Sequence, residues 1–285
     1  MSTANEQANS SGNGPASPMT RDFDVSQFDK VSTSINGTIR VSIGAPPSLT
    51  IRADEGAIGA IDALDVAVRE GTLILKPKRN WSGSSVGARS LAAQLLDQIL
   101  KRRGSGDREP SIGVTTQYTV EITTPHLREL VVGGSARVAL ESDVREDESF
   151  KLSCHGTTGV STRNISAPSV YFAASGTASL QVNEVTSEAF DCRISGTATI
   201  QAKGEATTVS ARLSGTGSLH ATELFTSQAS ITMSGATNAT INAQKALEVK
   251  SSGACSVRYL GDPKTSTKFS GVLDCAPLQA QEKSV

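Results

Sequence analysis

The chain has 285 residues, a net charge of −1 and only 4% aromatic residues. Serine, threonine and glycine occur 38, 28 and 25 times, so about a third of the chain consists of these small residues, an excess that argues against a helix bundle. No basic patch suits a nucleic acid, and no apolar run approaches the roughly 20 residues that cross a bilayer. The sequence therefore predicts neither a nucleic-acid partner nor a transmembrane segment.

The first residues of the chain are polar and small. Residues 1–20 contain no aromatic or β-branched aliphatic residue, which predicts a disordered tail over 1–22. They also lack the apolar stretch of a secretory signal peptide. This absence favours either a cytoplasmic protein or a chain that has lost its leader.

A helical pattern interrupts the middle of the chain. A β-strand segment is expected over 23–79, followed by an insertion over 80–112. Within the insertion, Leu91, Leu95 and Ile99 lie on one helical face, and a basic turn precedes Gly104, as at helix C-termini. The pattern predicts an amphipathic helix over about 88–103. This helix either caps the β-solenoid that the repeats of the second half predict or docks on a partner or a membrane surface. The single tryptophan, Trp81, is expected to anchor the insertion.

A repeat of about 20 residues dominates the second half of the chain. Its copies are centred on glycines 22, 20, 20, 19, 20, 18 and 18 residues apart, namely Gly134, Gly156, Gly176, Gly196, Gly215, Gly235, Gly253 and Gly271. Two and four residues before and after each glycine stand mostly apolar or small residues, whereas the odd offsets are mostly polar. This alternation predicts one half-buried strand through each glycine.

One strand per 20-residue period is typical of a rung of a β-solenoid. We therefore predict an all-β fold, a single-stranded right-handed parallel β-helix over 113–276, with a short tail over 277–285. No rung is stable alone, because each depends on ladder hydrogen bonds and packing with its neighbours.

Motifs before the repeats suggest a family. FDKVSTSINGTIRVSI and LTIRADEGAIGAIDALDVAVREGTLIL precede the insertion, and VEITTPHLRELVVGGSARV leads into the repeats. In this order they resemble, from about Phe28 to Asp274, the bacterial head GIN domain, a family of unknown function that carries the label auto-transporter adhesin. The resemblance implies a right-handed parallel β-helix, a location in the cell envelope or outside the cell, and no catalytic residues. The missing leader and the insertion depart from that pattern.

The cysteines and histidines offer no catalytic or metal-binding spacing. The four cysteines all occupy inward offsets, too far apart for disulfides, and are expected to be free thiols in the core: Cys154, Cys192, Cys255 and Cys275. The histidines are far apart in sequence, and no G-x-S-x-G elbow is present. No cofactor, metal site or catalytic residue is expected.

Two outward columns of charge are candidate surfaces. Glu184, Glu205 and Glu223 follow their glycines by eight or nine residues, so stacking would place them about 5 Å apart, as a calcium site or as solvated corner residues. A basic column three residues before the glycines could meet acidic glycans or simply solubilise the sheet: Arg193, Arg212, Lys250 and Lys268.

Three functions are consistent with this pattern. The first is a non-catalytic adhesin-like module whose Ser/Thr-rich face binds a glycan, an envelope component or its own copies. The second is a β-helical scaffold or filament subunit, a homo-oligomer, since little sequence follows the last rung to cover its edge. The third is a glycan-active enzyme that uses the glutamate column.

Overall fold

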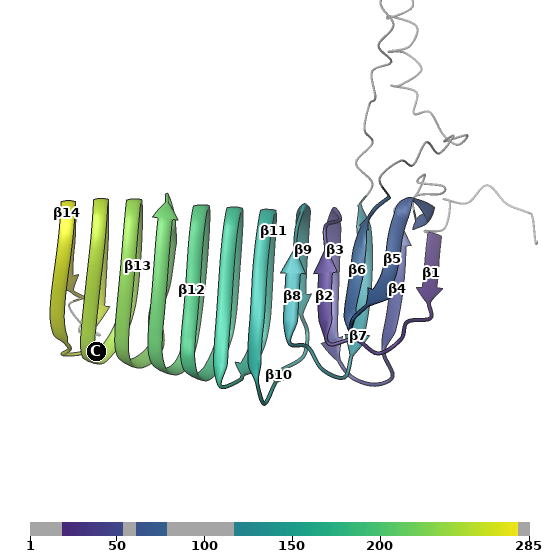
Figure 1. The fold of residues 1–285 in the computed structure, drawn as a ribbon, viewed down its shortest axis with the longest axis horizontal. Coiled ribbons are helices and arrows are strands. Elements are labelled where there is room, and N and C mark those ends of the chain that lie inside the picture. The colour runs from purple at the N-terminus through teal and green to yellow at the C-terminus, as the bar shows by residue number, and fades with distance from the viewer. Residues whose placement is uncertain (1–18, 54–60, 79–116, 279–285) are drawn as a thin grey trace, which may run out of the picture.

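The protein is a β-solenoid. The computed structural model describes residues 19–53, 61–78 and 117–278, and its strands stack into about seven turns (Figure 1). The described helical structure is a single 3-10 turn, η1 (Ile61–Ala63). The predicted all-β solenoid is confirmed, whereas the predicted helix at 88–103 and Trp81 lie outside the described residues.

The glycine repeats form the regular part of the stack. The strands β11 (Ser149–Ser166), β12 (Ser169–Gly215), β13 (Ser218–Leu260) and β14 (Lys264–Pro277) run through the repeat glycines, except for one break directly after Gly215. They pair in parallel, with Gly156 beside Gly176 and Gly253 beside Gly271. The apolar–polar alternation therefore predicts the strands, and the aligned glycines predict their register.

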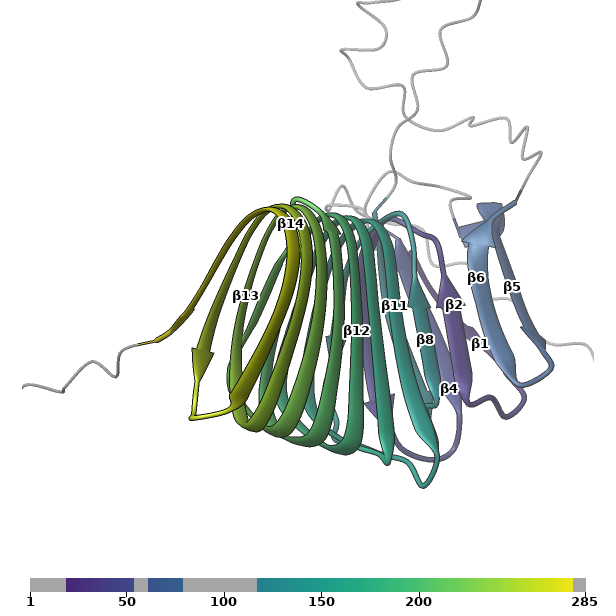
Figure 2. The same ribbon diagram turned by 60° about the vertical axis from the view of Figure 1, so that its left-hand side comes forward.

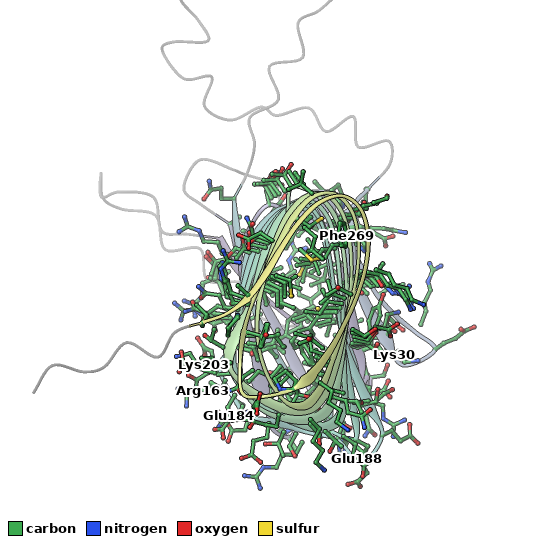
Figure 3. The ribbon with its side chains drawn as sticks, turned by 90° about the vertical axis from the view of Figure 1, so that its left-hand side faces the viewer. Lys30, Arg163, Glu184, Glu188, Lys203 and Phe269 are labelled. Atoms are coloured by element: carbon green, nitrogen blue, oxygen red, sulfur yellow. The ribbon has the colours of Figure 1, made fainter. Side chains whose placement is uncertain are left out.

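The column of glycines is the corner between two long faces of a flattened coil. Before Gly134, β8 (Glu129–Val132) pairs with the first half of β11, and after it β9 (Ser135–Leu140) pairs with the second half. The short β10 (Val144–Arg145) pairs with the end of β11. We call the two sides the pre-glycine and post-glycine faces. The view along the axis shows the resulting oval (Figure 3).

The amino-terminal turns are stacked out of sequence order. The rung of β2 (Lys30–Thr33) and β3 (Gly37–Ile43) lies between the later rung of β8 and β9 and the strands β6 (Thr72–Pro77) and β7 (Tyr118–Thr124). The strands of this rung pair in parallel with their neighbours on both sides. Figure 2 shows β2 beside β8 on one side of the coil.

Antiparallel strands close the amino-terminal end. On the post-glycine face, β4 (Ser48–Ala53) pairs with β7 and β1 (Met19–Phe23) pairs with β4. On the other face, β5 (Leu64–Arg69) pairs with β6. The expectation of parallel strands throughout is wrong here, and so is the tail boundary at residue 22, because β1 already begins at Met19.

The apolar columns meet inside the coil. Side chains four residues before the glycines are buried from Leu130 to Val249, and three aromatic rings of successive turns, Phe150, Phe172 and Phe190, meet edge to face with centroids 6.5 and 5.2 Å apart. The interior is thus filled with side chains, and the polar offsets form the surface.

Candidate binding surface

The glycine corner cannot carry side chains. Each repeat glycine has a positive φ, for example 87° at Gly176. A Cβ atom added there would lie 2.6 Å from the carbonyl oxygen of Gly156, in the turn below. Close stacking and backbone conformation together therefore require glycine along the whole corner.

Hydroxyl groups flank this bare corner on both sides. The residues just before and just after the glycines are exposed or half-buried. We call this set the hydroxyl edge: Ser175, Ser195, Ser214, Ser234, Ser252, Ser270, Thr157, Thr177, Thr197 and Thr216. Because the turns stack in register, the hydroxyls recur about every 4.8 Å along the axis.

A groove runs beside the hydroxyl edge on the post-glycine face. It has a volume of about 740 Å³ and crosses β3, β9, β11 and β12, with Thr38, Arg137, Thr157, Thr177, Ser179, Thr197 and Thr199 among its lining residues. Gly159 widens it, since an added Cβ at this position would meet nothing within 4 Å. The groove thus offers hydroxyls, one guanidinium group and exposed backbone to a ligand that lies along the axis.

Two of the three predicted glutamates, Glu205 and Glu223, are out of register in the structure. Glu223 pairs in register with Lys203, and their side chains form a 2.9 Å ion pair. Glu205 lies beside Phe225, because the register shifts after Gln201. Figure 3 shows Glu184 and Lys203 at the lower left of the oval, away from Phe269 at its upper right. Within the described ranges no cluster of His, Cys, Asp and Glu could hold a metal ion.

The basic column is partly engaged by its neighbours. The guanidinium of Arg193 lies 5.4 Å from the centre of the Tyr171 ring, a cation–π contact. Lys250 forms a 2.8 Å ion pair with Glu248. Arg212 is exposed beside Thr232. These charges stand on the pre-glycine face, so they do not line the groove.

An ion-pair network that sequence reasoning missed lies near the amino-terminal turns. Arg128 reaches the carboxylates of Asp29, Glu146 and Glu148 at 3.6, 3.8 and 3.0 Å. The Glu146 side chain is only 6% exposed and accepts a 2.8 Å hydrogen bond from the backbone N–H of Leu127. In the sequence, the run of acidic residues at 146–148 is the only sign of this network. The network joins three separate loops, which indicates a structural role.

The cysteines and histidines are arranged as the sequence predicted. All four thiols are free, and three of them are buried. Burial raises the pKa of Cys154 and that of Cys192 to about 12, so these thiols stay neutral and unreactive. His155 lies on the exposed serine column, with its Nδ1 atom 2.7 Å from Ser175 Oγ. It has the surface position that its offset predicts.

In the part of the chain that the structure describes, no helix is long and apolar enough to cross a membrane. Among curated proteins, no match is found.

Solved structures share the fold over nearly the whole chain. Two proteins of Parabacteroides, a "putative lipid binding protein" of P. distasonis and a "putative adhesin" of P. merdae, are 18% and 17% identical; both comparisons cover 94% of this chain and 98% of the other and give TM-scores of 0.75. A "putative adhesin" of Bacteroides fragilis is 17% identical over 93% of this chain and 99% of its own, with a TM-score of 0.59. At these identities the likeness concerns the fold alone.

A family model matches residues 27–263, which include every strand from β2 to β13. The chain therefore belongs to the family "Putative auto-transporter adhesin, head GIN domain".

Proposed function

We propose that this protein is a non-catalytic, adhesin-like module of the cell envelope that binds a glycan along the hydroxyl edge and its groove. The observation that carries the proposal is the groove of about 740 Å³, lined by threonine and serine hydroxyls from consecutive turns. The family's description as an adhesin is consistent with such a role.

The chemistry of this surface suits a polyhydroxylated ligand. A hydroxyl group both donates and accepts hydrogen bonds, so each Thr or Ser can match either role of a sugar hydroxyl. A pyranose unit of an extended chain is about as long as the 4.8 Å spacing between turns. Successive sugars can therefore meet successive turns, and many weak contacts along one chain combine into useful avidity.

The interior of the coil favours this ligand over a lipid tail. The described core is packed with side chains such as Phe150, Phe172 and Phe190, so an acyl chain would have to displace them. Threonine and serine hydroxyls line the groove. A polar, extended polymer fits these features better.

The absence of catalytic groupings among the described residues supports a binding role. Glu205 lies beside Phe225 rather than Glu223, and Glu223 is paired with Lys203. General acid–base cleavage of a glycan needs two carboxyl groups flanking one bond. We therefore expect that no polysaccharide is depolymerised, and that Glu184→Gln/Glu205→Gln leaves reducing-end release at the background rate.

Affinity electrophoresis tests the binding directly. The full chain is run through native gels that contain dextran, alginate or glycol chitosan, which represent neutral, acidic and amino-sugar polymers. We expect at least one polymer to retard the protein. In Thr177→Val/Thr197→Val, which keeps the side-chain shape but removes two hydroxyls of the groove, we expect about tenfold weaker retardation, because each lost hydrogen bond costs about 0.5–1.5 kcal/mol.

The matched control is Thr207→Val. Thr207 is exposed and stands outside the groove, so this variant should migrate like the wild type in every gel. Wild-type mobility that no polymer changes, or equal retardation of the double variant, would contradict the proposed function.

A further inference from the structure

The carboxyl-terminal end of the solenoid exposes both a strand edge and the end of the core. Strand β14 pairs with β13 on one side, and in the described part of the chain no strand pairs with its other side. Phe269 is 62% exposed, although Met233, two turns below it in the same column, is buried. Val272 is 70% exposed on the outer side of the corner. A 14-residue edge that exposes apolar side chains is a template for another strand.

The residues of β14 are complementary to β14 itself. In an antiparallel pair whose twofold axis passes through Gly271, residues equally far before and after this glycine face each other. Lys268 then lies opposite Asp274 of the second copy, and Phe269 lies opposite Leu273. Directly opposite residues point to the same side of a sheet, so the two apolar ends form one continuous core. Outside it, Lys268 of each copy adds a second cation to Asp274 of the other, which already forms an ion pair with Arg258 of its own chain.

The corner at Gly271 selects this register. Its φ of 104° continues the glycine corner of the lower turns, and the strand passes there from one face of the oval to the other. Only the register centred on Gly271 places corner against corner. Other registers set a bend against an extended strand.

Among the described residues, the amino-terminal end offers no equivalent partner for β14. There the outermost strands are β5 and β1, which have only six and five residues. They lie on different faces, and one runs parallel and the other antiparallel to the strands of the regular turns. Head-to-tail stacking would therefore leave much of β14 unpaired. We propose that two copies of this chain form a closed dimer through antiparallel β14 strands, with the twofold axis at Gly271.

This dimer has a consequence for the surface described above. The axis passes through the glycine corner, so the hydroxyl edges of the two copies meet end to end and form one edge of double length. The dimer does not depend on the glycan proposal, because it forms without ligand.

Paired cysteines test the register. Lys268→Cys/Asp274→Cys, in a Cys275→Ser background, places thiols of the two copies opposite each other. In one chain these positions point outward from different faces. With oxidised glutathione, we expect a dimer band on a non-reducing gel. In Ser266→Cys/Asp274→Cys, the first cysteine is shifted by two residues along the strand, so the thiols of the two copies no longer lie opposite each other. This variant should give only a trace of the dimer band.

Sedimentation of the full chain without glycan measures the assembly itself. We expect a monomer–dimer equilibrium, and Lys268→Glu should raise its dissociation constant about tenfold, since two attractive pairs become repulsive. Lys264→Glu, whose opposite residue carries no charge, is the control and should sediment like the wild type. A wild-type monomer at every concentration, open-ended polymers, or equal cross-linking of the two cysteine pairs would overturn the proposal.

Discussion

From Gly156 to Gly271, each turn of the solenoid brings a glycine against the carbonyl group of the glycine one turn below. At Gly196 an added Cβ would lie 2.8 Å from the oxygen of Gly176, and φ is 93°. Gly196→Ala should therefore combine backbone strain with a steric clash and lower the free energy of unfolding by about 2–4 kcal/mol.

Gly159 is the matched control for this prediction. Its added Cβ meets nothing within 4 Å, and it is not among the positive-φ glycines. Gly159→Ala should leave stability unchanged or raise it by up to about 1 kcal/mol. Urea unfolding followed by circular dichroism compares the two variants. Equal losses would contradict the stacking argument.

The buried thiols predict a dependence of stability on alkaline pH. Burial raises the pKa of Cys154 and Cys192 from 9.0 to about 12 in the folded protein. Above pH 9 the unfolded chain therefore releases protons that the folded chain keeps. The stabilisation is fully present below pH 9 and is lost as the pH rises toward 12, by up to about 1.4 kcal/mol per pH unit for each thiol.

Urea midpoints between pH 8 and pH 11 measure this effect. Cys192→Ala is the comparison, because Ala211 holds the same column in the next turn. The two proteins differ only at residue 192, so the midpoint of the wild type should fall more steeply than that of the variant. Parallel slopes would show that burial of this thiol does not control the pH dependence.

Residue-level reasoning from sequence identified the columns but not every neighbour. The offset from the glycine correctly placed three of the four thiols inside and His155 outside, whereas Cys275 of the last turn is only half-buried. The same offsets misplaced Glu205, because the irregularity between Gln201 and Lys203 shifts the register and sets Glu205 beside Phe225. A bulge in a corner depends on packing with the turn below, and no single-chain pattern records it.

At the level of elements, one aromatic residue joins three turns of the core. Phe172 is fully buried between the rings of Phe150 and Phe190. Phe172→Ala should cost about 3–5 kcal/mol of unfolding free energy through the lost burial and the remaining cavity. Phe172→Leu, which matches Leu152 in the turn below, should cost less than about 1.5 kcal/mol.

Chemical denaturation of these two variants distinguishes packing from aromatic character. A loss for the leucine variant as large as that for alanine would show that the edge-to-face contacts, rather than filled volume, hold this region together.

The strands differ in how far the sequence predicts their partners. From β11 to β14 the partner lies one period away, so the spacing of the glycines defines the register. The partners of β2 include β8, about 100 residues later in the chain, and the antiparallel strands β1, β4 and β5 have no repeat signal. Local alternation predicts that such strands exist, but their pairing depends on tertiary contacts.

For the whole molecule, the two ends of the coil differ and its corner is uniform. Antiparallel strands close one end, while β14 leaves the other end open for a second copy. Between them the glycines keep one corner free of side chains, and exposed hydroxyls line both of its sides. The sequence predicted this Ser/Thr-rich surface from alternation alone. It did not predict the groove, because the groove includes Thr38 of a rung inserted from elsewhere in the chain.

Hydrogen exchange tests most directly where the protein binds a glycan. Amide exchange of the full chain is compared with and without the polysaccharide that retards it in the gel. The account predicts slower exchange in peptides that contain the corners at Gly156, Gly176 and Gly196, and unchanged exchange around Thr207 at the far side of the oval. Protection confined to the far corner or to the pre-glycine face would contradict the assignment of the hydroxyl edge as the binding surface.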